Sequence, residues 1–141
     1  MKRYEWVEHP SDIGFRAYGR NLAEAFENAA LALFEVMVDT SKVEPWEEVE
    51  VELKAKDEGA LLYDWLDRLI YLHDFRNLVM SKFKVGISRV EGGLKLDAKV
   101  MGEKFDPKKH TDRTAVKAMT YHLMEIKQQK NLCYVQAVVD I

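Results

Sequence analysis

Residues 46–72 read WEEVEVELKAKDEGALLYDWLDRLIYL, and the spacing of the apolar residues changes within this one stretch. In the first part, apolar and charged residues alternate, which predicts a strand with one face in solvent. In the second part, apolar residues recur every three or four positions after Asp57, a good helix N-cap. The apolar positions are Val49, Val51, Leu53 and Ala55, and then Leu61, Leu62, Trp65, Leu66, Leu69, Ile70 and Leu72. A strand followed directly by a helix is therefore predicted here.

A second helix is predicted upstream, over residues 22–37, where the same three- and four-residue spacing recurs. Asn21 can cap it, with Glu24 as its capping-box partner. Its apolar positions are Leu22, Ala25, Phe26, Ala29, Leu33, Phe34 and Met37.

The remaining periodic segments alternate and predict strands, over residues 3–9, 14–19, 83–90, 94–101, 120–129 and 133–141. Glycines at 92 and 93 predict a hairpin turn, and Lys130 with Asn131 predicts another. A polar loop over 102–113 precedes one helical turn near 115–118. We therefore expect an α+β fold in a single domain, residues 1–141: a largely antiparallel sheet with two main helices on one face. Mixed pairing and strong curvature of the sheet remain open.

Composition excludes several classes of protein. With 141 residues, of which 48% are hydrophobic, the chain can bury one core. Charged residues of both signs are interspersed and the net charge is only -3, so binding of nucleic acid through overall charge is not expected. Cys133 has no partner for an internal disulfide and lies among apolar residues. The N-terminus lacks an apolar signal region and no long apolar run occurs, so we expect a cytoplasmic protein that does not enter membranes.

Carboxylates at the two ends of the chain form the first candidate site. Asp12 follows Pro10 and Ser11 in the stretch EHPSDIGF, where an aspartate is also common as turn chemistry. The last strand ends in Asp140 and Ile141, which adds a side-chain carboxylate and the terminal one. If this strand pairs beside the first, three carboxylates converge and repel one another unless a cation neutralises them. Oxygen ligands suit Mg²⁺ or Ca²⁺ better than zinc.

The sequence gives weaker support for the other candidate site residues. His9, His110 and His122 lack the spacing of a zinc motif, and no second cysteine is present. A phosphate or an acidic partner can be engaged by Lys117, Tyr121 and His122. Lys117 is equally well explained as a solvated lysine, and Tyr121 as a ring in the core. The residues alone leave three hypotheses open: a binding module that presents a cation, a metal-dependent phosphohydrolase, and a chaperone-like interaction module.

Five stretches together resemble the archease family, in order along nearly the whole chain. They are EHPSDIGFRAYG, NLAEAFENAALALFEVMVD, GEKFDPKKH, VKAMTYHLMEI and the terminal VVDI. The resemblance implies a protein cofactor without enzymatic activity of its own, which activates an RtcB-type tRNA-splicing RNA ligase. It implies faster guanylylation of a ligase histidine and multiple turnover, with GTP and tRNA contacted only indirectly through the ligase.

The resemblance also implies residue roles. Asp12, Asp140 and the carboxylate end of Ile141 are implied as the site of a divalent cation, Ca²⁺ or Mg²⁺. The family pattern draws attention to Asp39 and Lys117 as functional surface. His9, His110, Tyr121 and His122 are further candidates for the surface that contacts the partner.

Overall fold

The structure is a computed structural model and describes residues 2–9 and 12–141; the side chains of Glu8 and His9 lie outside this description. Its elements follow in the order β1 (Tyr4–His9), β2 (Asp12–Gly19), α1 (Leu22–Met37), the short 3₁₀ helix η1 (Thr40–Lys42), β3 (Glu47–Ala55), α2 (Glu58–Arg76), β4 (Leu78–Val90), β5 (Gly93–Lys104), β6 (Ala118–Gln129) and β7 (Leu132–Asp140).

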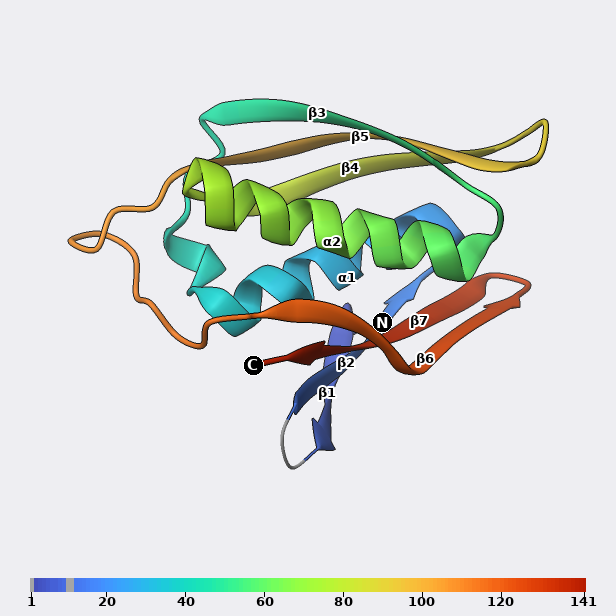
Figure 1. Cartoon of the computed structure of the whole chain (residues 1–141), viewed down its shortest axis with the longest axis horizontal. Coiled ribbons are helices and arrows are strands. Elements are labelled where there is room, and N and C mark those ends of the chain that lie inside the picture. Colours follow the sequence, from blue (N-terminus) through green and yellow to red (C-terminus); the bar gives the residue numbers. More distant parts are fainter. Residues whose placement is uncertain (1, 10–11) are drawn as a thin grey trace.

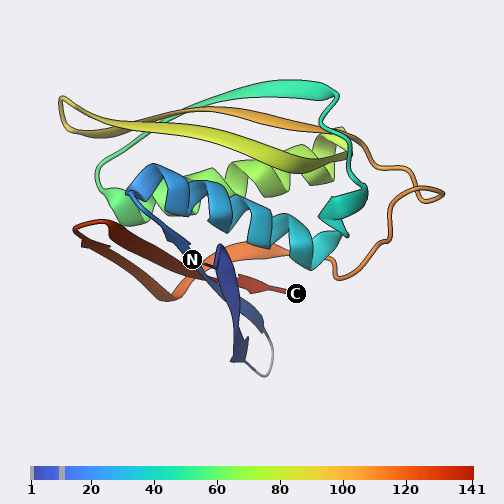
Figure 2. The same ribbon diagram turned by 180° about the vertical axis from the view of Figure 1, so that it is seen from behind.

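The strands form two antiparallel sheets with the two helices between them (Figures 1 and 2). One sheet has the order β1-β2-β7-β6 and the other the order β3-β5-β4. The predicted α+β class, the antiparallel pairing and both helices are confirmed. The expectation of one sheet with helices on one face is corrected, because each helix packs against strands of both sheets.

Helix α1 fits between two sheets because much of its buried surface is alanine. Small side chains allow strands to approach the helix backbone from both sides, while larger apolar residues fill the remaining space. The fully buried residues of α1 include Ala25, Phe26, Ala29, Ala30, Ala32, Leu33 and Phe34. Helix α2 is joined to α1 by the buried Trp65, whose Nε1–H donates to the carbonyl of Phe26 over 3.0 Å. The core therefore lies around the helices rather than on one side of them.

Both predicted N-caps are present. The Asn21 side chain accepts from the N–H of Glu24 over 2.9 Å, and the Asp57 side chain accepts from the N–H of Ala60 over 2.8 Å. The Glu24 carboxylate differs slightly from the capping-box expectation, because it accepts from the N–H of Arg20, one residue before the cap.

The predicted helical turn near 115–118 is wrong, because residues 113–117 form no helix and β6 begins at Ala118. Their backbone N–H groups bond elsewhere: Arg113 donates to Met37 over 3.0 Å, Thr114 to Val36 over 3.0 Å, and Lys117 to Asp140 over 2.8 Å. The first two carbonyls lie at the C-terminus of α1, where helix carbonyls have no partner within the helix. Segment 105–117 therefore caps α1 from outside instead of folding into a helix.

The C-terminal hairpin follows the prediction, with Asn131 in the left-handed region at its turn (φ 65°). Strand β4 begins earlier than expected, at Leu78, and its register shifts between Met80 and Lys82. This irregularity interrupts the alternation by which a strand is recognised in a sequence. Neither helix in the described residues has the length and hydropathy needed to cross a membrane.

Candidate functional site

The pairing of β2 with β7 brings the two ends of the chain together. Asp12, the first residue of β2, lies directly opposite Asp140, the last residue of β7. Residues directly opposite in an antiparallel pair share one face of the sheet, so the two side chains lie on the same face. On the other side of β2, the backbone of His9 in β1 is the register partner of Asp12. The last strand pairs with β2 and not with the first strand, β1, as the prediction required. Because Asp12 belongs to β2, it still meets Asp140.

An open hollow of about 850 Å³ adjoins this row of residues. It is lined by Trp6, Val7, Asp12, Ile13, Gly14, Glu35, Val36, Arg113, Thr114 and Ile141. These residues come from the β1–β2 hairpin, the C-terminal end of α1, the capping segment and the end of the chain. Asp12 and Ile141 line the hollow themselves, whereas Asp140 adjoins it through its pairing with Asp12.

Two charged residues of the hollow were not predicted from the sequence. Arg113 Nη1 donates to both the carbonyl and the carboxylate Oε2 of Glu35, each over 2.9 Å. The other carboxylate oxygen of Glu35 accepts from the N–H and the hydroxyl of Thr40. Glu35 and Arg113 are 78 positions apart, and no local pattern marks either of them, so only the fold brings them together. Arg113 offsets part of the negative charge around the hollow.

Asp39 lies just beyond α1 and caps η1, accepting from the N–H of Ser41 over 3.1 Å and from its hydroxyl over 2.7 Å. These hydrogen bonds from Ser41 lower the pKa of Asp39. The guanidinium of Arg113 also approaches the carboxylate, at 4.0 Å. Asp39 is therefore an ionised group next to the hollow, linked to it through Arg113.

The other predicted surface residues separate into two groups. Lys117 is exposed and its N–H donates to the carbonyl of Asp140. It therefore lies beside Asp12 and Asp140, which we call the carboxylate row. Tyr121 stacks on Tyr63 of α2 with ring centroids 4.3 Å apart, and burial raises the pKa of its hydroxyl. His122 lies in the stretch of β6 where the register with β7 shifts. Neither Tyr121 nor His122 is among the residues that line the hollow.

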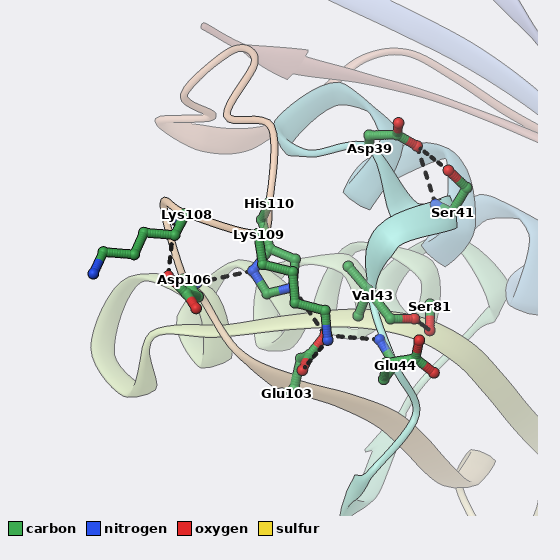
Figure 3. Close-up of polar contacts among 10 residues, drawn as sticks. All are labelled: Asp39, Ser41, Val43, Glu44, Ser81, Glu103, Asp106, Lys108, Lys109 and His110. Carbon is green, nitrogen blue, oxygen red and sulfur yellow. Dashed lines mark hydrogen bonds and ion pairs between the residues drawn. The ribbon is translucent and has the colours of Figure 1, made fainter.

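His110 lies elsewhere, in a buried polar cluster with only 3% of its surface exposed (Figure 3). Its Nε2 is 2.9 Å from Oε2 of Glu103, and its Nδ1 accepts from the N–H of Asp106 over 2.8 Å. Glu103 also accepts from Lys109 Nζ over 2.9 Å and from the N–H of Glu44 over 2.7 Å. Buried in this way, His110 cannot contact a partner directly.

The pKa of Glu103 shows how strongly this cluster holds its charge. Burial alone raises the pKa of a carboxyl, but the hydrogen bonds from Glu44, Lys109 and His110 outweigh it and lower the pKa of Glu103 to about 2. The cluster is thus an internally neutralised assembly in which each charged group already has its partners.

Among the side chains that the structure describes, which exclude those of Glu8 and His9, no three of His, Cys, Asp or Glu lie close enough to hold a metal ion together. The oxygen donors at and beside the hollow include the carboxylates of Asp12 and Glu35, which line it, and that of Asp140, the register partner of Asp12; Ile141 also lines the hollow. Oxygen donors of this kind fit a hard cation such as Mg²⁺ or Ca²⁺ and do not fit zinc or copper.

Comparisons with known sequences point to one protein family. The model of the archease protein family matches residues 4–141. The chain is 54% identical over 141 residues to a protein archease of Sulfurisphaera tokodaii and 47% identical to one of Methanothermobacter thermautotrophicus, with full coverage of both chains in each case.

Two solved structures resemble this one. The solution structure of protein 1598 from Methanobacterium thermoautotrophicum has a TM-score of 0.87 and 45% identity, with full coverage of both chains. A Thermotoga maritima archease, described as a possible chaperone, has a TM-score of 0.61 and 22% identity, and the match covers 96% of this chain and 94% of that one.

Proposed function

Because the chain belongs to the archease family, we propose that it acts as an activator of an RtcB-type RNA ligase, without enzymatic activity of its own. In this role it speeds guanylylation of the ligase histidine and so permits multiple turnover. The observation that supports the proposal most directly is the pairing of Asp12 with Asp140 beside the hollow that Ile141 lines.

Two like charges directly opposite each other in a sheet are unfavourable, and a bound cation relieves the repulsion. Asp12 and Asp140 are the residues that would hold a divalent cation, together with the main-chain carboxylate of Ile141. When bound, such a cation would supply positive charge that neutralises the triphosphate of GTP while the guanylyl group is transferred to the ligase histidine and pyrophosphate leaves.

Other charged residues at and beside the hollow would surround this cation site. Arg113 bonds to Glu35 and approaches Asp39, so these two acidic groups already have a cationic neighbour. In this proposal the metal ion is attracted by the paired carboxylates of Asp12 and Asp140. Lys117 lies beside these carboxylates, bonded through its backbone to Asp140, and presents an exposed cation to a partner or its phosphates.

The test is a multiple-turnover ligation assay with the partner ligase, GTP and Mg²⁺. We expect Asp12→Asn and Asp140→Asn to abolish most of the stimulation while far-UV circular dichroism stays unchanged. Asp67→Asn is the matched control, because Asp67 is an exposed aspartate on α2 that does not line the hollow. A Gly added after Ile141 moves the terminal carboxylate and should weaken stimulation as well. Full stimulation by both Asp variants would contradict the cation site.

The phosphohydrolase hypothesis needs a histidine near the carboxylates to activate water. His110 does not fit this role, because both of its ring nitrogens are committed to Glu103 and Asp106 in the buried cluster. The side chain of His9, the register partner of Asp12, lies outside the described residues. We expect no release of phosphate from phosphoesters by the purified chain alone.

One observation favours a chaperone-like interaction module as a second candidate. Tyr71 and Phe75, near the end of α2, are 50% and 76% exposed, and their rings lie 5.1 Å apart. Exposed aromatic pairs of this kind occur at protein interaction surfaces. If this surface carries the function, Phe75→Ser lowers ligase stimulation and the two Asp→Asn variants leave it unchanged, which is the reverse of the pattern expected from the cation site.

A further inference from the structure

Segment 105–117 connects β5 to β6 and carries Arg113 and Thr114 to the rim of the hollow. On one side it follows the end of α1, where Thr111, Arg113 and Thr114 bond to the backbone of residues 36–39. At its far end, Lys117 bonds to Asp140. Arg113 also bonds to Glu35 through its side chain. Each of these hydrogen bonds contributes only modestly, so the contacts that hold the beginning of the segment add to its placement.

The beginning of the segment is held by the buried pair of Glu103 and His110. The N–H of Asp106 donates to Nδ1 of His110, so Nδ1 carries no proton. The proton of the neutral ring is therefore on Nε2, which donates to Glu103 over 2.9 Å. In this single tautomer, both ring nitrogens have a partner and His110 connects the loop backbone to β5.

Glu103 in turn connects three parts of the chain. It belongs to β5, accepts the N–H of Glu44 before β3, and receives Lys109 and His110 from the segment itself. The Lys109 ammonium also lies 4.5 Å from the ring centroid of Trp46. Figure 3 shows the contacts to Glu103 converging on its carboxylate, while the Lys108 side chain points away from it. Loss of one partner leaves a buried group without its bond, which is costly.

We infer that the Glu103–His110 pair is a positioning device that fixes residues 111–117, and with them Arg113, at the rim of the candidate cation site. This inference rests on the proposed function of the hollow. His110 itself touches neither the hollow nor a partner and acts through the segment it anchors. A chain in which the pair is broken must order the segment when it binds the ligase, which reduces its apparent affinity.

Two substitutions each remove one of the ring's hydrogen bonds. His110→Gln retains an N–H that can reach Glu103 but offers no acceptor to Asp106. His110→Asn offers an acceptor near the position of Nδ1 but is too short to reach Glu103. Lys108→Gln is the matched control in the same loop, because the Lys108 side chain points away from the cluster (Figure 3). His110→Ala removes both bonds at once.

The first readout is hydrogen exchange of the amides of Arg113 and Thr114, with amides in the core of α2 as the reference for global stability. We expect exchange at 113 and 114 to accelerate about tenfold in His110→Gln and His110→Asn, and further in His110→Ala, since each lost bond shifts the local opening equilibrium. Core amides of α2 and the Lys108→Gln variant should stay close to the native chain. Equal acceleration everywhere, or none at 113 and 114, would overturn the inference.

The second readout separates positioning from a direct role in the ligase reaction. In the ligation assay, the concentration of activator needed for half-maximal stimulation should rise several-fold in the His110 variants, while stimulation at saturation matches the native chain. A lower maximum at an unchanged half-saturating concentration would overturn the positioning role. If the native chain gives no stimulation, the proposed function fails, and the exchange measurement decides the inference on the Glu103–His110 pair independently.

Discussion

The buried cluster around Glu103 and the pair of Asp12 and Asp140 beside the hollow use carboxylate side chains in opposite ways. Glu103 lies in a setting where three donors of the chain converge on it, and its pKa falls to about 2. Asp12 instead has another aspartate, Asp140, as its cross-strand partner. A carboxylate surrounded by donors of its own chain stabilises the fold, whereas two carboxylates directly opposite each other repel, and the proposed cation site is argued from that repulsion. The surroundings of an acidic residue, rather than its identity, distinguish the two roles.

Removal of the carboxylate from each region should give the largest contrast. Glu103→Leu leaves Lys109, His110 and the N–H of Glu44 without their acceptor, so the free energy of unfolding should fall by about 3–5 kcal/mol. Asp12→Asn removes one of two like charges and should change that free energy by no more than about 1 kcal/mol. Urea denaturation of both variants measures the difference. Losses of similar size in the two variants would show that the two regions do not differ in the way described.

Low pH should reduce the stability that the Glu103 cluster contributes, which is the second largest effect we expect. The pKa of Glu103 lies at about 2 in the folded chain, below its ordinary value of 4.5. The unfolded chain therefore binds more protons between these values, and stability falls as the pH drops from about 4.5 toward 2. A depression of this size corresponds to about 3 kcal/mol, which is fully present above pH 4.5. Urea denaturation across this range should show a clearly shallower slope for Glu103→Gln than for the native chain.

Divalent cations should act on the hollow and leave the cluster unaffected. Ca²⁺ at about ten times its Kd should stabilise the native chain by about 1.4 kcal/mol, and EDTA should reverse the effect. Thermal unfolding with and without Ca²⁺ measures this shift. Asp12→Asn and Asp140→Asn should lose it, while Asp67→Asn keeps it. The same gain in every variant would indicate that calcium binds elsewhere.

The smallest expected effects come from substitutions of the two exposed tryptophans. Trp46 is 74% exposed but faces the Lys109 ammonium, whereas Trp6 is 48% exposed and lines the hollow. Trp46→Leu removes a cation–π contact and should reduce the free energy of unfolding by about 0.5–1 kcal/mol. Trp6→Leu removes an edge-to-face contact with the ring of Tyr4, 5.3 Å away, and should reduce the free energy of unfolding by a similar amount. Only the contact of Trp46 involves a charge, so urea denaturation at low and high salt should show a salt dependence for Trp46→Leu alone. The same salt dependence in both variants would contradict the assignment.

Much of the secondary structure could be predicted from the sequence, because it depends on neighbours within a few residues. Helix α1 was predicted over the residues that it occupies, and its cap at Asn21 is confirmed. The failures occur where distant partners override local preference. Residues 115–118 were expected to form a helical turn, but the N–H groups of residues 113, 114 and 117 are taken by α1 and β7. The shift between Met80 and Lys82 similarly concealed the start of β4.

The candidate site was only partly predictable for the same reason. Asp12, Asp140 and Ile141 were identified by residue type, but their meeting was conditional on strands being neighbours. His110 was placed on a functional surface, yet its bond to Glu103 buries it. No pattern in the sequence marks Arg113 or Glu35 as part of a site. Charged residues are common in polar loops and on helices, and only the fold brings these two together.

The sequence by itself determined the strands, both helices and their caps, and it supplied carboxylates near each end of the chain. These features follow from hydrophobic period and from hydrogen bonds between residues close in sequence. Only the tertiary structure decided that the strands form two sheets around the helices and that Asp12 faces Asp140. Strand order and register depend on which arrangement buries the whole core, and partners more than a hundred residues apart leave no local trace of that choice.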